Sequence, residues 1–70
     1  MIYRDVIRKL MILDCKELPR RGGGSHWKWY HSRTGRATVL PDWGDRDLKI
    51  GTLKAAIKQL GIEWDAFFKA

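Results

Sequence analysis

The chain has 70 residues, of which 44% are hydrophobic and 31% are charged. This balance is typical of a small folded domain and excludes a disordered tail. A chain of this length forms a single domain, 1–70, with a thin core. Fourteen Lys and Arg against eight Asp and Glu give a net charge of +6, which favours a polyanion or an acidic protein as the partner.

Several classes of protein are excluded by what the sequence lacks. No apolar run approaches the length of a membrane span, and the N-terminal residues lack the apolar core of a signal peptide. A single cysteine, Cys15, forms no internal disulfide, which fits a reducing, cytoplasmic location. Two histidines and one cysteine are too few and too scattered for a zinc site, and no Walker motif is present. We therefore expect no metal, no cofactor and no membrane contact.

The first half of the chain predicts a helix followed by strands. Apolar residues at Ile2, Val6, Leu10 and Leu13 recur at helical spacing and predict a helix over 2–13. Residues 14–19 predict a turn into a first strand that ends near Pro19, because proline donates no ladder hydrogen bond. Residues 20–24 form a basic, glycine-rich bend.

A second strand is predicted over 25–32, and alternation along it separates two faces. One face carries the tryptophans and the other is polar: Trp27, Trp29 and His31 against His26, Lys28 and Tyr30. A turn at 33–35 leads into a third strand over 36–40, where Ala37 and Val39 are expected to join the tryptophan face. Residues 41–45 are typical of a loop.

The last third of the chain predicts a second helix and a short helical turn. Leu53, Ala56, Ile57 and Leu60 form a buried stripe over 50–60, and Gly61 ends the helix. Residues 63–68 offer aromatic side chains as a lid on the core: Trp64, Phe67 and Phe68. The expected fold is an α+β domain of order αβββα, with both helices on the tryptophan face of a three-stranded antiparallel sheet and a short C-terminal helix.

His26 is the strongest candidate for chemistry. Histidine exchanges protons near neutral pH, and this one follows a glycine bend on the open strand face. Attack of an RNA 2′-hydroxyl on the neighbouring phosphate needs such a group together with cations, which Arg20, Arg21 and Lys28 supply. The alternative is that His26 is an exposed strand residue with no function.

Other candidates are weaker. His31 shares parity with Trp29 and is expected to be partly buried and hydrogen-bonded, and Cys15 is expected to be a half-buried structural thiol. Ser25 as a nucleophile is rejected, because His26 beside it points to the opposite strand face. The tryptophans either stack on bases or pack the core, and packing is favoured for Trp29 and Trp64.

The motifs, taken in order, resemble those of the HicA-type toxins, small mRNA-cleaving ribonucleases of toxin–antitoxin pairs. The resemblance rests on Gly24-Ser25-His26, on the run from Asp47 to Lys54 and on the run from Ala56 to Ile62. It implies a fold like that of double-stranded RNA-binding domains and a metal-independent endoribonuclease acting on mRNA. It also implies a HicB-like antitoxin that masks the His26 face.

The resemblance assigns the catalytic role to His26. The residues expected to bind RNA are Arg20, Arg21, Gly24, Ser25, Lys28 and Tyr30. The alternative, a non-catalytic RNA-binding module, fits the same fold and charge. Three positions depart from the family pattern: Trp27 stands where a second histidine is frequent, the loop at 41–43 lacks a histidine, and a glycine before the first strand is replaced near Asp14.

Overall fold

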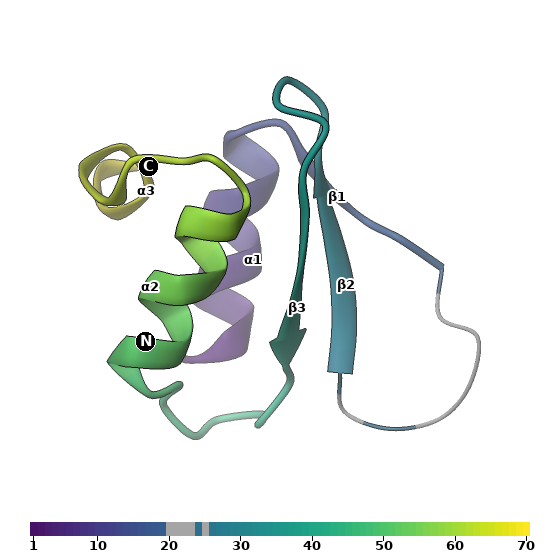
Figure 1. Ribbon diagram of the computed structural model, residues 1–70. Coiled ribbons are helices and arrows are strands. Elements are labelled where there is room, and N and C mark those ends of the chain that lie inside the picture. Colours follow the sequence, from purple (N-terminus) through teal and green to yellow (C-terminus); the bar gives the residue numbers. More distant parts are fainter. Residues whose placement is uncertain (20–23, 25) are drawn as a thin grey trace.

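The computed structural model describes residues 1–19, 24 and 26–70, and its elements follow the predicted order (Figure 1). They are α1 (Tyr3–Ile12), β1 (Cys15–Glu17), β2 (His26–His31), β3 (Ala37–Pro41), α2 (Ile50–Gln59) and α3 (Trp64–Lys69). The α+β class and the order αβββα are confirmed, and each main helix ends within one residue of its predicted bounds. In the described part of the chain, no helix is long and apolar enough to cross a membrane.

The three strands form one antiparallel sheet in the order β1-β2-β3. Tyr30 in the central strand lies opposite Lys16 on one side and Ala37 on the other. Figure 1 shows α1 and α2 packed on one face of this sheet, while none of the described helices covers the other face. The prediction that both helices cover the same face is therefore confirmed, and the second face stays open.

The core lies between the sheet and the helices. It contains Trp29 from β2 and Leu40 from β3, with a larger set from the helices and the loops: Tyr3, Val6, Leu10, Leu48, Leu53, Ala56, Ile57, Leu60 and Phe67. Trp29 Nε1 donates a buried hydrogen bond of 3.1 Å to the Tyr3 hydroxyl. Because this bond satisfies the indole N–H, Trp29 is buried at little polar cost and ties β2 to α1.

The predicted orientation of β3 is wrong. Thr38 and Leu40 face the helices, whereas Val39 is 50% exposed on the open face and Ala37 is only partly buried. The reason is the register: Trp29 pairs with Thr38 across a four-residue turn at 32–35, and directly opposed residues share a face. The buried Thr38 hydroxyl is satisfied by a 2.6 Å hydrogen bond to Gln59 Oε1.

The C-terminal lid is only partly as predicted. Phe67 is fully buried and Trp64 packs against the core, but Phe68 is 60% exposed. Consecutive helical residues point about 100° apart, so the short α3 buries one phenylalanine and leaves its neighbour outside. The Phe68 carbonyl accepts a 2.9 Å hydrogen bond from Lys9 Nζ, which links α3 to α1.

Pro41, expected in the loop, is instead the last residue of β3.

Gly61 ends α2 as predicted. Its φ of +76° is left-handed, and the Ile62 N–H and Gly61 N–H bond back to carbonyls of the last helical turn. A Cβ at this position would lie 3.0 Å from Thr34 Cγ2 in the β2–β3 turn. Glycine is therefore required both by the backbone and by the close approach of this turn.

Candidate functional site

The open face of β2 carries the polar residues that the alternation predicted. His26 and Lys28 are exposed and Tyr30 is partly buried, whereas Trp29 and His31 on the opposite face are buried. Lys16 lies directly opposite Tyr30 and therefore shares the open face. We call these four residues the open-face cluster: Lys16, His26, Lys28 and Tyr30.

Lys16 was missed by sequence analysis. Its position depends on the β1–β2 register, which a three-residue strand next to a glycine-rich bend does not reveal. The signal available was the burial of Cys15, because alternation then turns Lys16 outward.

His26 lies at the edge of the cluster where the sheet ends. It is the first residue of β2 and pairs with Pro41, the last residue of β3, so the loop after β3 leaves the sheet beside it. Gly24, two residues earlier, has a φ of +111°, a conformation that favours glycine. The His26 side chain is exposed at this end of the open face.

Three predicted site residues lie outside the described residues: Arg20, Arg21 and Ser25. The glycine-rich bend that was expected at 20–24 is described only at Gly24. The predicted residues that the structure places near one another are His26, Lys28 and Tyr30, at alternate positions of one strand.

The lysines of the open-face cluster have no acidic partner in the part of the chain that the structure describes. The described ion pairs join the N-terminal amine to Asp47, Arg8 to Asp5 and Arg33 to Asp14. The charges of Lys16 and Lys28 are therefore available to an anion at this face. Lys28 lies two residues from His26 on the same face, about 7 Å along the strand. Its ammonium group is therefore placed to contact a phosphate close to the one that reacts at His26.

His31 is buried and hydrogen-bonded, as predicted. It is 7% exposed on the helix-covered face, and its Nδ1 accepts a 3.3 Å hydrogen bond from the Arg33 N–H. The Nδ1 contact helps to hold the turn after β2, because it links the end of the strand to the turn backbone. His31 is thereby separated from the open face by the sheet itself.

Cys15 is also structural, and it is more deeply buried than predicted. Burial, with a contribution from the nearby Asp14 carboxylate, raises the pKa of the Cys15 thiol to about 11. The thiol is therefore neutral at physiological pH and is a poor nucleophile. Among the described residues, no three His, Cys, Asp or Glu side chains lie close enough together to hold a metal ion.

A small basic αβββα domain with a histidine and unpaired lysines on an open sheet face has the features of a domain that acts on nucleic acid. The family model described as the HicA toxin of bacterial toxin–antitoxin systems matches residues 3–62. The chain belongs to the HicA toxin family.

A curated relative supports this assignment. The protein called "Probable mRNA interferase HicA" from Pseudomonas fluorescens (strain Pf0-1) is 43% identical over 42 residues, which cover 60% of this chain and 67% of the relative. No solved structure showed a significant match.

Proposed function

We propose that this protein is the toxin of a toxin–antitoxin pair and cleaves mRNA in the cytoplasm, with His26 as its general acid/base. The observation that carries the proposal is the exposed His26 at the end of β2, on the same face as the unpaired Lys28. Membership of the HicA family and the mRNA interferase name of the relative support this activity.

The reaction that this arrangement suits is transesterification within RNA. The 2′-hydroxyl oxygen attacks the adjacent phosphorus, its proton passes to the His26 imidazole, and the bond to the 5′ oxygen breaks. The leaving oxygen takes a proton from water or from the imidazolium, which leaves a 2′,3′-cyclic phosphate and a 5′-hydroxyl. The Lys28 ammonium offsets the negative charge that builds up on the phosphate oxygens.

A metal-free cleavage assay tests the activity. Purified protein and a long mRNA are incubated in EDTA, and we expect fragments with 2′,3′-cyclic phosphate ends, which His26→Ala abolishes. The matched control is Ser32→Ala, because Ser32 is an exposed polar residue that follows the opposite end of β2. Binding without cleavage by the unmodified protein identifies a non-catalytic RNA-binding module instead and refutes the nuclease.

The proposed regulator is an acidic, HicB-like antitoxin that covers the open-face cluster. The net charge of +6 favours a rapid, salt-sensitive association with an acidic chain, and Tyr30 is of a residue type that often anchors interfaces. Covering His26 and Lys28 excludes RNA without a change of fold, so inhibition is competitive with substrate.

Titration of the purified antitoxin at several RNA concentrations, with hydrogen exchange on the complex, tests this masking. We expect apparent inhibition to weaken as RNA rises, and protection to include β2. Protection confined to α1 and α2 would refute the masking of this face.

A further inference from the structure

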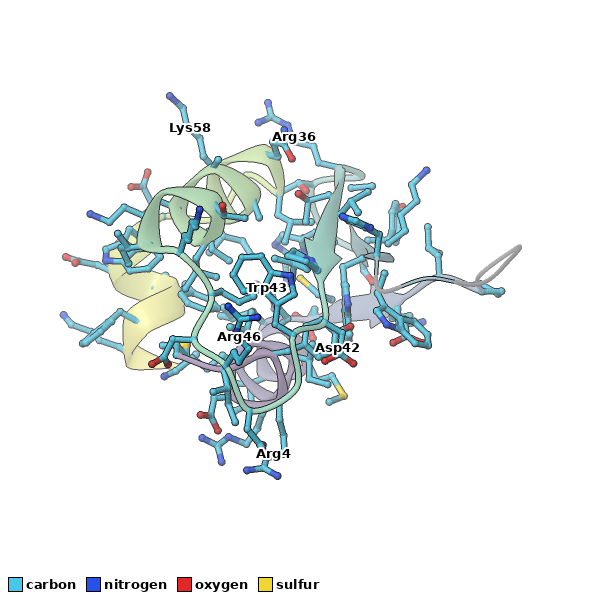
Figure 2. The ribbon with its side chains drawn as sticks, turned by 90° about the horizontal axis from the view of Figure 1, so that it is seen from below. Arg4, Arg36, Asp42, Trp43, Arg46 and Lys58 are labelled. Carbon is cyan, nitrogen blue, oxygen red and sulfur yellow. The ribbon has the colours of Figure 1, made fainter. Side chains whose placement is uncertain are left out.

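The loop between β3 and α2 holds an arginine over a tryptophan ring. Arg46 Cζ lies 5.7 Å from the centre of the Trp43 ring (Figure 2). The backbone N–H of Arg46 donates a 3.2 Å hydrogen bond to the Trp43 carbonyl. Trp43 is partly buried and packs against the core, whereas Arg46 is exposed. The ring thus supports one side of the guanidinium and leaves its N–H groups towards solvent.

The loop is closed by a local hydrogen bond around Trp43 and is joined to the N-terminus after Arg46. Asp42 Oδ1 accepts a 2.9 Å hydrogen bond from the Gly44 N–H, across Trp43. After Arg46, Asp47 Oδ1 lies 2.7 Å from the N-terminal amine, and the Leu48 N–H donates to the Met1 carbonyl. Arg46 is therefore presented by a constrained loop, which lowers the ordering cost when it binds a ligand.

The loop around Arg46 carries three aspartates: Asp42, Asp45 and Asp47. Asp42 and Asp47 are engaged within the protein, Asp45 is exposed, and within the described ranges Arg46 forms no ion pair with any of them. The positive charge of Arg46 is therefore not neutralised by an ion pair and is available to an anion. Its planar fork of donors matches the oxygens of a phosphate. A guanidinium that has a stacking partner but no counterion is suited to bind a phosphate group.

The position of the loop relates this arginine to His26. Because His26 pairs with Pro41, the loop that begins at Asp42 leaves the sheet next to the proposed reacting group. An RNA strand bound at His26 can follow the open face towards Lys28 in one direction and pass over this loop in the other. In this arrangement Lys28 and Arg46 contact RNA phosphates on opposite sides of the phosphate that reacts at His26.

We propose that Arg46, supported by Trp43, binds an RNA phosphate beside the cleavage position and so positions the substrate strand at His26. The proposal rests on the proposed ribonuclease function. Arg46 is an RNA-binding residue in this arrangement, and Trp43 is a positioning residue that acts through Arg46.

Binding is measured by fluorescence anisotropy with a labelled single-stranded RNA, in the His26→Ala protein, across a range of salt concentrations. Arg46→Ala is expected to raise Kd about fivefold and to reduce the steepness of the salt dependence by about 0.7. The matched control is Arg36→Ala, which removes the same charge next to the opposite end of β3 (Figure 2). Equal effects of the two variants would overturn the proposal, since only overall charge would then matter.

The role of Trp43 is tested without any change of charge. Trp43→Leu is expected to raise Kd about twofold and to leave the salt dependence unchanged, whereas Trp43→Phe restores binding because it keeps an aromatic ring. Asp45→Asn is expected to tighten binding more than Asp65→Asn in α3, because Asp45 is the neighbour of Arg46. Failure of the phenylalanine to rescue Trp43→Leu, in proteins with matching thermal unfolding, would contradict the positioning role.

Failure of this proposal is distinguishable from failure of the proposed function. If the unmodified protein cleaves RNA and Arg46→Ala binds it as tightly as Arg36→Ala, the loop assignment is wrong and the ribonuclease stands. If the unmodified protein cleaves no RNA, the proposed function fails, whatever Arg46 contributes to binding.

Discussion

The central strand has a histidine at each end, and the two faces of the sheet give them opposite surroundings. His26 is exposed on the open face, with Lys28 as its neighbour on that face. His31 is 7% exposed on the other face, where its Nδ1 accepts a backbone hydrogen bond. His31 lies five positions after His26, an odd number, so strand alternation turns the two side chains to opposite faces. The comparison teaches that parity, and not residue type, separates the proposed reactive histidine from the structural one.

The same rule applies to β3, where residue type suggests the opposite orientation. The β-branched, apolar Val39 is exposed opposite Lys28, and the polar Thr38 is buried opposite Trp29. Thr38 tolerates burial because Gln59 Oε1 accepts a hydrogen bond from its hydroxyl group. The register decides the faces because a shift by one residue would turn Leu40 out of the core.

The largest effect on stability is expected from truncating the side chain on the buried face of β3, compared with truncating its neighbour on the open face. Leu40→Ala removes a fully buried side chain and is expected to lower the free energy of unfolding by about 3 kcal/mol. Val39→Ala, one residue earlier on the open face, is expected to change it by less than about 0.5 kcal/mol. Urea unfolding of both variants measures the difference. Similar losses would mean that β3 does not separate the two faces.

The two histidines are expected to differ in both stability and activity. His31→Ala leaves a cavity and an unpaired Arg33 N–H, and we expect a loss of about 2 kcal/mol with cleavage retained by the folded fraction. His26→Ala is expected to cost less than about 0.5 kcal/mol and to abolish cleavage. Chemical unfolding and cleavage are measured on the same preparations. Loss of cleavage in a fully folded His31→Ala protein would break the comparison of the faces.

A smaller effect is expected from a lysine of the open face. Lys28→Ala removes an unpaired cation near His26 and is expected to lower kcat/KM for RNA cleavage about fivefold, equivalent to about 1 kcal/mol. Lys69→Ala in α3 removes the same charge far from the open face and is expected to leave kcat/KM nearly unchanged. Cleavage rates at several RNA concentrations separate the two. An equal decrease for both lysines would show that overall charge alone governs substrate binding.

Much of the fold and part of the candidate site follow from the sequence alone. Helical spacing of apolar residues located α1 and α2, and alternation along β2 separated His26 from His31, because each signal is contained within one element. The orientation of β3 and the place of Lys16 depend on pairing between strands, which a single segment does not record. The stacking of Arg46 on Trp43 depends on a loop closed by contacts with the N-terminus, 46 positions away in the chain at Asp47.

The smallest effect is expected at Asp14, whose turn sets the start of β1 and hence which of Cys15 and Lys16 faces the core. Asp14 has a φ of +66°, and its carbonyl accepts a 3.1 Å hydrogen bond from the Ser32 N–H. Left-handed backbone is strained for most residues with a Cβ and is not strained for glycine. Asp14→Gly is therefore expected to keep or raise stability by up to about 0.5 kcal/mol, and Asp14→Ala to lose about 1 kcal/mol.

The ion pair at this turn needs its own control. Asp14 Oδ2 lies 2.9 Å from Arg33 Nε, but both side chains are largely exposed, and such pairs contribute little. We expect Arg33→Ala to change the free energy of unfolding by less than about 0.5 kcal/mol. Urea unfolding measures the order of stability: we expect Asp14→Gly to be at least as stable as the unmodified protein, and Asp14→Ala to be less stable than both. If Arg33→Ala, Asp14→Gly and Asp14→Ala all lose the same amount, the ion pair and not the backbone conformation stabilises the turn. The start of β1, and with it the outward position of Lys16, would then depend on a surface charge pair.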